Sequence, residues 1–214
     1  MPTISGFSDT EAESVRGAML VAKLCIDAAL KEAFFDDGGF SSRIGKYFGS
    51  NEAGTHAIMK TINSMKLLIE TDVYCVKRGG DIEDSNAKAD HFTTQSIVFG
   101  GSDARQARTA RLQGTMMYEG KRVNHVESVM TDAPKNGAFE MELFDNFFGL
   151  PYMLQDSQSQ IETFLHELSH VAAGTKDVDA PSCYGWGGVQ YCKSIKKGTE
   201  NAESYGMFLQ SYIG

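Results

Sequence analysis

The sequence of 214 residues lacks the features that a membrane protein or a nucleic-acid-binding protein requires. No stretch approaches the roughly 20 uninterrupted apolar residues of a membrane-spanning helix. The most apolar segment near the N-terminus, Ala18 to Leu30, is broken by Lys23 and Asp27. The formal net charge is −8 and the sequence has no cluster of Lys and Arg, so its surface repels phosphate backbones. We therefore expect neither a membrane nor a nucleic acid as a partner.

Cysteine is scarce as well, and none of the four cysteines has the C-x-x-C spacing of a structural zinc site. An even number allows two disulfides, and we expect Cys25 to pair with Cys75 and Cys183 with Cys192, because the second pair would brace one loop. Four buried thiols in a reducing cytosol are the alternative. The sequence also shows no basic leader with a small-residue cleavage site. We expect a soluble protein, secreted or delivered as an effector, without a cleavable signal in this chain.

Apolar residues at helical intervals predict helices in the first and last thirds of the chain. Ser8 and Glu11 have the spacing of a capping box, and the apolar pattern that follows predicts one long helix. Gly174 fits the position directly after a helix that ends near Ala173. The helices expected from these signals cover residues 8–35, 43–48, 51–70, 157–173, 190–196 and 199–212.

The middle of the chain has a different texture, rich in aromatic and β-branched residues. We expect strands at Val73–Val76, Phe92–Phe99 and Phe139–Phe148. We find no repeat, no low-complexity tract and no linker, so the chain reads as one α+β domain, mostly helical with a small antiparallel or mixed sheet. Within it, residues 1–71 form a mainly helical part, residues 72–150 the sheet region, and residues 157–214 a helix, a loop and the C-terminal helices.

The segment His166-Glu167-Leu168-Ser169-His170 carries the strongest chemical signal. On a helix, positions i and i+4 share a face, so His166 and His170 can bind one metal ion. Two neutral imidazoles suit Zn²⁺, and a catalytic zinc site keeps one position for water. Zinc lowers the pKa of that water to about 7, so Glu167 suffices as the base that removes its proton.

A third protein ligand is needed, and its identity separates the classes of zinc peptidase. The extended pattern H-E-x-x-H-x-x-G-x-x-H fails, because Ala173 replaces its glycine and Lys176 its third histidine. An aspartate just after the helix or a glutamate on a later helix remains. These candidates are Asp177, Asp179, Glu200 and Glu203.

Residues after the helix resemble a known family. Gly174-Thr175-Lys176-Asp177, followed by Tyr184-Gly185, is similar to the Gly-Thr-x-Asp…Tyr-Gly signature of the aspzincins, the deuterolysins and peptidyl-Lys metalloendopeptidases. Asn201-Ala202-Glu203-Ser204-Tyr205 is similar to the family's Asn-Ala-Asp-x-Tyr, and Phe147 to Pro151 resembles the strand before its zinc helix. The resemblance covers roughly residues 140–212.

The resemblance implies a role for each matched residue. It implies that Asp177 is the third zinc ligand and that Tyr184 hydrogen-bonds the oxyanion. Glu203 matches the aspartate that lines the pocket for the residue after the cut in the lysine-specific branch. The second acidic residue of that branch is Gly206 here. The six residues from Val178 to Cys183 depart from the family pattern, which usually has two residues at this place.

Together these signals predict a zincin-like zinc metalloendopeptidase that cuts a protein or peptide substrate, with a preference for lysine after the cut as a further expectation. The segment Phe139–Phe148 is the expected edge strand beside which the substrate lies extended. Two alternatives stay open. One is a peptidase that uses Glu203 or Glu200 as the third ligand, and the other is a secreted effector or binding module with a non-catalytic zinc site.

Overall fold

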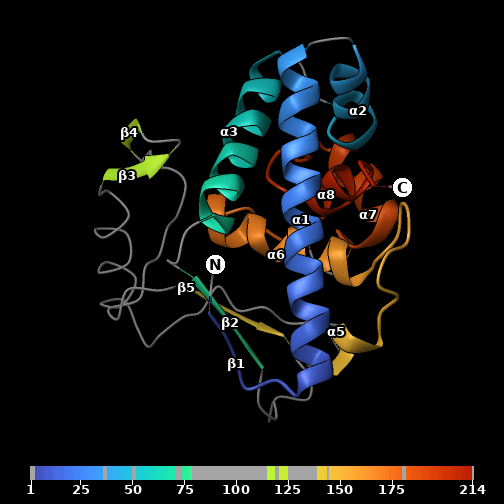
Figure 1. Ribbon diagram of the computed structural model, residues 1–214. Coiled ribbons are helices and arrows are strands. Elements are labelled where there is room, and N and C mark those ends of the chain that lie inside the picture. Colours follow the sequence, from blue (N-terminus) through green and yellow to red (C-terminus); the bar gives the residue numbers. More distant parts are fainter. Residues whose placement is uncertain are drawn as a thin grey trace, which may run out of the picture.

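The computed structural model describes residues 3–35, 38–49, 52–70, 74–78, 115–118, 121–124, 139–143, 145–179 and 182–213. Its helices are α1 (Asp9–Phe35), α2 (Gly39–Tyr47), α3 (Glu52–Ile69), α5 (Asp145–Gly149), α6 (Gln160–Ala173), α7 (Gly185–Ser194) and α8 (Ala202–Gln210). Its strands are β1 (Thr3–Ser5), β2 (Tyr74–Arg78), β3 (Thr115–Tyr118), β4 (Lys121–Asn124) and β5 (Phe139–Leu143). This part of the chain is mostly helical with little strand (Figure 1). None of its helices is both long and apolar enough to cross a bilayer.

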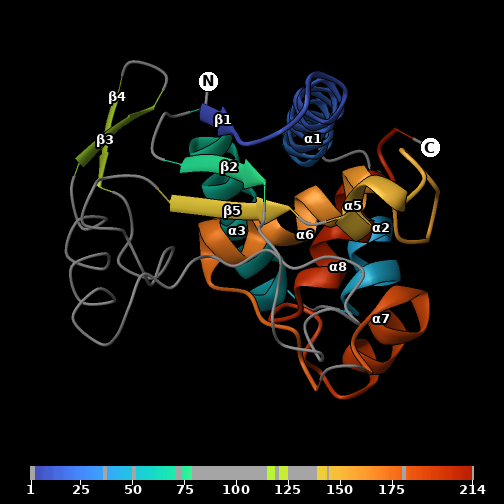
Figure 2. The ribbon, with the colours of Figure 1, turned by 90° about the horizontal axis from the view of Figure 1, so that it is seen from below.

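Three short strands pair in parallel in the order β1-β2-β5. Val76 in the central strand is paired with Ile4 on one side and with Met141 on the other. Figure 2 shows the three strands side by side. A parallel pair requires a long crossover connection, and the chain passes through α1, α2 and α3 between β1 and β2. The strands β3 and β4 form a separate antiparallel pair.

The strand predictions are met in part. Val73–Val76 overlaps β2, but the predicted strand Phe139–Phe148 is too long: β5 ends at Leu143, and α5 begins at Asp145. The expected antiparallel or mixed sheet is wrong for β1, β2 and β5, which are all parallel. Strand direction depends on crossover connections, which local periodicity does not encode. The predicted strand Phe92–Phe99 lies outside the described residues.

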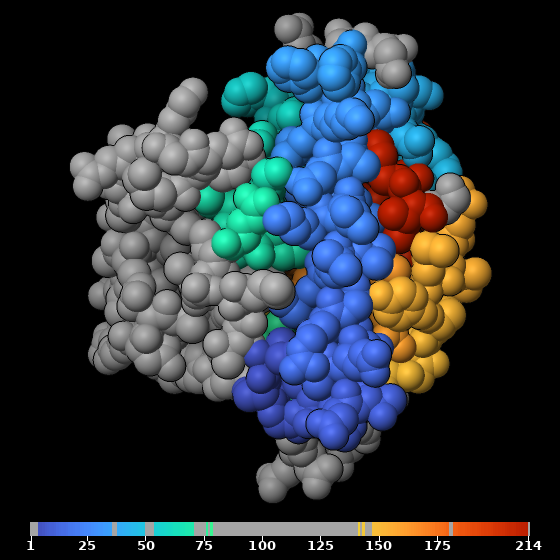
Figure 3. Space-filling model, in the orientation of Figure 1, coloured from blue at the N-terminus to red at the C-terminus, as the bar shows by residue number. Residues whose placement is uncertain are grey.

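Helix α1 begins where the capping box predicts. The backbone N–H and the hydroxyl of Ser8 donate to Oε2 of Glu11 at 2.9 and 2.8 Å, and the N–H of Glu11 points back to Oγ of Ser8 at 3.4 Å. Arg78 then joins the start of α1 to the sheet, because it donates to Oε1 of Glu11 at 3.0 Å and to the carbonyl of Leu143 at 3.3 Å. From there α1 runs along one face of the molecule (Figure 3).

Helix α6 lies at the centre of the core, where it packs against α1, α3 and α8. Every residue from Gln160 to Ala172 is buried except His170. All residues of α8 are buried as well. Buried polar groups usually have hydrogen-bond partners, and His166 in α6 has such a partner in α8, where Oε2 of Glu203 lies 3.0 Å from its Nδ1.

An aromatic cluster holds α7 and α8 against α2. The ring of Phe208 in α8 lies 6.0 Å from that of Tyr47 and 5.3 Å from that of Phe48, which follows α2. Trp186 in α7 stands edge-on to Tyr47 at 5.5 Å, and Tyr205 packs on Phe48 at 4.9 Å. Such pairs contribute about 0.5–1.5 kcal/mol each beyond their buried area. The cluster therefore fixes the positions of α7 and α8 relative to α2.

Candidate metal centre

The ends of α6 are set by local capping. Ser159 is its N-cap, and the Ser159 hydroxyl accepts the N–H of Glu162 at 3.1 Å. At the other end, Gly174 has a φ of 67° and its N–H bonds the carbonyl of His170 at 2.9 Å. A left-handed residue at this position favours glycine, and it turns the chain sharply back toward the histidines.

Three side-chain atoms converge beside α6. Nε2 of His166 lies 3.1 Å from Nε2 of His170 and 3.0 Å from Oδ1 of Asp177, and the distance from His170 Nε2 to that oxygen is 3.3 Å. Bonds of about 2.0–2.1 Å in a tetrahedral zinc site separate ligand atoms by about 3.3 Å. The donor types and their spacing therefore fit a zinc ion.

The second nitrogen of each imidazole is also engaged. Nδ1 of His170 lies 2.6 Å from the backbone carbonyl of Thr175, and Nδ1 of His166 lies 3.0 Å from Oε2 of Glu203. A carbonyl oxygen accepts only, so Nδ1 of His170 is the donor to Thr175, and Nε2 is the nitrogen that lies beside His166 and Asp177. Partners of this kind orient the imidazoles of metal sites.

Asp177 is held by a bridge between two loops. The N–H of Lys176 donates to the carbonyl of Glu200 at 2.8 Å, and the N–H of Ala202 donates to the carbonyl of Lys176 at 3.0 Å. Burial acts to raise the pKa of Asp177, but hydrogen bonds with His166 and His170 lower that pKa well below its usual range. The carboxylate is therefore ionised, as a zinc ligand must be.

Two of the other carboxylates considered as the third ligand, Asp179 and Glu200, have partners away from the histidines. Asp179 accepts a hydrogen bond from the Tyr191 hydroxyl at 3.0 Å, and Glu200 forms an ion pair with Lys197 at 2.7 Å. Within the described ranges, the side-chain groups with the spacing to hold an ion include neither Asp179 nor Glu200. Asp177 is the carboxylate that the fold brings to both histidines.

Glu167 lies next to the three converging atoms. Its Oε1 is 4.0 Å from Nε2 of His166, and its Oε2 has no hydrogen-bond partner among the described residues. Burial, with Asp177 nearby, raises the pKa of Glu167 well above its usual range, and His166 opposes this rise. An orphaned buried carboxylate oxygen at this place is available to a small polar molecule such as water.

Tyr184 reaches the centre from the start of α7, where it is the N-cap residue. Its ring is stacked on that of His166 with centroids 6.2 Å apart and planes 27° apart. The family resemblance implied a place for this tyrosine at the centre despite the six residues that separate it from Asp177, and both residues lie beside His166 in the structure.

Glu203 does not occupy the position expected of a pocket residue. Its side chain is 0% exposed, Oε2 contacts His166, and Oε1 accepts the N–H of Gly185 at 2.7 Å. The carboxylate therefore lies behind His166, where it has no surface open to a substrate side chain. Its contact is with Nδ1 rather than Nε2 of that histidine, so it is also separate from the set formed with His170 and Asp177.

Two groups near the histidines, Glu162 and the carbonyl of Thr175, were not predicted from the sequence. Glu162 is fully buried, and neither carboxylate oxygen has a hydrogen-bond partner among the described residues. Burial, with Glu203 close by, raises the pKa of Glu162 well above its usual range. Glu162 lies one helical turn before His166, so helical spacing was the signal that could have identified it. A backbone carbonyl such as that of Thr175 leaves no such signal.

The structure does not contain the expected disulfides. Cys25, Cys183 and Cys192 are free and buried. Sγ of Cys192 is directed at the carbonyl of Val178 at 4.0 Å, and burial raises the pKa of Cys183 to about 12. Close packing, rather than a disulfide, therefore holds Cys183 at the end of the loop between Asp177 and Tyr184.

That packing predicts a stability difference between adjacent glycines of α7. A Cβ added at Gly188 would lie 2.0 Å from the carbonyl carbon of Cys183, whereas a Cβ at Gly187 meets nothing within 4 Å. Gly188→Ala is expected to lower the free energy of unfolding by about 1–3 kcal/mol, the usual cost of overpacking. Gly187→Ala should raise it by up to about 1 kcal/mol, because alanine favours helix. Urea denaturation of both variants measures this, and equal stabilities would contradict the packing described.

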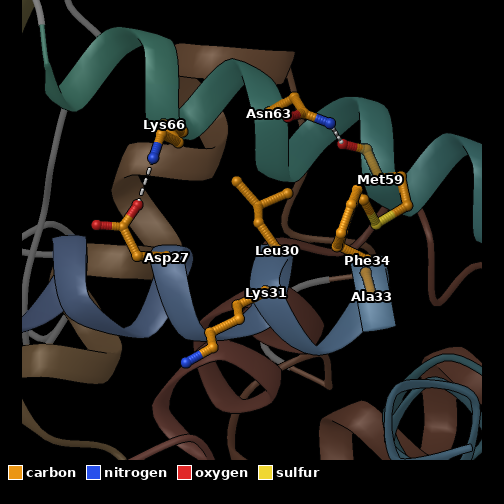
Figure 4. Close-up of a pocket in the computed structure, with 8 residues that line it drawn as sticks. All are labelled: Asp27, Leu30, Lys31, Ala33, Phe34, Met59, Asn63 and Lys66. Carbon is orange, nitrogen blue, oxygen red and sulfur yellow. Dashed lines mark hydrogen bonds and ion pairs between the residues drawn. The ribbon is translucent and has the colours of Figure 1, made fainter. Parts of the chain in front are cut away.

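An open groove of about 480 Å³ lies between α1 and α3 (Figure 4). Its lining residues are Asp27, Leu30, Lys31, Ala33, Phe34, Met59, Asn63 and Lys66. Lys66 and Asp27 form an ion pair at 2.5 Å between the two helices. The groove includes no residue of the candidate centre.

Comparisons with known proteins support the fold. The sequence matches no protein-family model and no curated protein. Among solved structures, the chain is similar to a zinc peptidase from Grifola frondosa, with a TM-score of 0.58 over 96% of this chain and 97% of that one. The two sequences are 17% identical, so the likeness is one of fold. The chain therefore shares the fold of that zinc peptidase.

Proposed function

We propose that this chain is a zinc-dependent endopeptidase of the aspzincin type, which hydrolyses internal bonds of a protein or peptide. The proposal is carried by the convergence of His166 Nε2, His170 Nε2 and Asp177 Oδ1 within 3.3 Å of one another. Three protein ligands leave the fourth position of a tetrahedral ion to water or substrate, as in catalytic rather than closed structural sites. The shared fold with a zinc peptidase supports the same reaction class.

The residues around the centre have distinct tasks in this reaction. A zinc ion held there would polarise the scissile carbonyl and lower the pKa of bound water to about 7. Glu167 accepts a proton from the water at Oε2 and then delivers it to the leaving amine. Tyr184 donates its phenol hydrogen to the carbonyl oxygen as negative charge develops there, which contributes on the order of 3 kcal/mol.

We place the substrate in extended form beside β5. This strand is last in the order β1-β2-β5, so one of its edges has no partner strand in the described sheet. Helix α6 packs against the same strand, which brings a peptide on that edge toward the histidines. Main-chain hydrogen bonds provide affinity in such β-augmentation. A lysine preference is not part of this proposal, because Glu203 is buried behind His166.

Removal of the metal is expected to abolish hydrolysis, and added zinc is expected to restore it. The test is to dialyse the protein against a chelator, to measure zinc content, and to follow cleavage of casein and of a peptide library by mass spectrometry. Circular dichroism before and after dialysis confirms that the metal-free protein stays folded. Cleavage that persists without metal would contradict the proposal. One zinc per chain without any cleavage would favour a non-catalytic binding module instead.

A further inference from the structure

The carboxylate of Glu203 contacts two sides of the centre at once. Oε2 lies 3.0 Å from Nδ1 of His166, and Oε1 accepts the backbone N–H of Gly185 at 2.7 Å. We propose that Glu203 is a positioning residue that holds His166 and Tyr184 in a fixed relation, so that metal affinity and the placement of the phenol depend on one carboxylate. The part that concerns Tyr184 rests on the proposed endopeptidase function. The part that concerns the metal does not.

The first contact, from Oε2 of Glu203 to Nδ1 of His166, selects the tautomer of that imidazole. Nitrogen Nε2 of His166 can bind a metal ion only if the ring proton is on Nδ1. A carboxylate oxygen accepts the proton of an N–H group, so Oε2 of Glu203, at 3.0 Å from Nδ1, selects this tautomer and orients the ring. Loss of such a partner typically lowers metal affinity 10–100-fold.

The second contact, in which Oε1 of Glu203 accepts the N–H of Gly185, fixes the start of α7. Gly185 has a φ of 67°, in the left-handed region, and its N–H is turned inward to Oε1 of Glu203. Tyr184 is the preceding residue, and its ring is stacked on His166. Because one peptide unit joins the N–H of Gly185 to Tyr184, release of that N–H frees the backbone that aims the phenol.

Glu203 itself has no room to move. It is 0% exposed near the start of α8, and that helix is pressed closely on α6. A Cβ added at Gly206 would lie 2.2 Å from Oε1 of Glu162, so no space remains between the two helices there. With its backbone fixed, an aspartate at position 203 would place its carboxylate about 1.5 Å back along the side chain. It would then lose at least one of its two hydrogen bonds.

Two substitutions separate the effect of the carboxylate at position 203 from the effect of side-chain length. Glu203→Gln keeps the length, but an amide has one acceptor oxygen and both partners are donors, so one hydrogen bond is lost. Glu203→Asp keeps the charge and loses the length. Glu200→Gln is the matched control, because that side chain is exposed and pairs only with Lys197 in the described structure. Circular dichroism verifies that each variant folds.

The experiment measures zinc affinity by chelator competition, tryptophan fluorescence, and kcat and KM. Trp186 is the one tryptophan in the sequence and follows Gly185, so its emission reports on the start of α7. Both Glu203 variants are expected to bind zinc about 10–100-fold more weakly, to shift the emission of Trp186, and to lower kcat more than they raise KM. In a Tyr184→Phe background, Glu203→Gln should lower kcat by a smaller factor, which a merely structural role would not produce.

Two results would overturn the positioning role. One is zinc affinity and Trp186 emission equal to wild type in both Glu203 variants, and the other is a kcat loss of the same size with and without the Tyr184 hydroxyl. If the wild-type chain binds zinc but cleaves nothing, the proposed function fails. The affinity and emission measurements then still decide whether Glu203 joins His166 to the start of α7.

Discussion

Glu167→Gln is expected to bind zinc as the wild type does and to hydrolyse peptides about 10²–10⁴-fold more slowly, the usual contribution of a general base. The amide keeps the volume of the side chain but does not take a proton from water. His166, His170 and Asp177 provide the converging atoms without Glu167, so metal content should not change. Zinc analysis and initial cleavage rates on one peptide measure the two effects separately.

The control for this variant is Glu13→Gln, on the exposed side of α1, which should leave both zinc content and cleavage unchanged. Cleavage by Glu167→Gln at the wild-type rate would refute the role of Glu167. Loss of zinc together with activity would show that Glu167 supports the metal rather than the proton transfer.

Asp177→Asn is expected to weaken zinc binding by more than about 100-fold, beyond the loss typical of residues that only orient the ligands. The substitution keeps the shape and removes the charge, and a neutral amide oxygen is a poor zinc ligand compared with a carboxylate. Oδ1 of Asp177 is the oxygen that lies 3.0 and 3.3 Å from the two Nε2 atoms. Chelator competition measures the affinity, and hydrolysis should fall in parallel.

Asp179→Asn tests the alternative that the sequence left open, in which Asp179 rather than Asp177 is the third zinc ligand. Asp179 has a φ of 53°, which asparagine tolerates well, and its carboxylate bonds Tyr191 rather than the histidines. Zinc affinity is therefore expected to stay within a few-fold of the wild type. The reverse pattern, with zinc lost in Asp179→Asn and kept in Asp177→Asn, would overturn the ligand assignment.

The helices were predictable because their signals are local. The Ser8 and Glu11 pair, the apolar spacing of α3 and the glycine after α6 each act within a few residues, and each is present in the structure. The sheet was less predictable. Its pairing of Ile4 with Val76 and of Val76 with Met141 joins segments far apart in the chain, and single-sequence patterns do not report such contacts.

In the candidate site too, the features set by local sequence were predictable and those set by tertiary packing were not. The spacing of His166 and His170 indicated one shared face, and the resemblance identified Asp177, which lies beside both histidines. The position of Glu203 was not predictable, because it depends on how α8 packs against α6. An acidic residue on a helix reads equally well as a pocket residue, a surface residue or a partner for a buried imidazole, and only tertiary packing chooses among them.

The loop between Asp177 and Tyr184 has a consequence for chain entropy. It has six intervening residues where the aspzincin pattern usually has two, and the cost of closing a loop grows only with the logarithm of its length. The change from two to six residues adds about 1 kcal/mol on this scale. The contact of Tyr184 with His166 and the hydrogen bond from Gly185 to Glu203 offset a cost of this size. The chain can therefore lengthen at this point while both ends of the loop stay where the chemistry needs them.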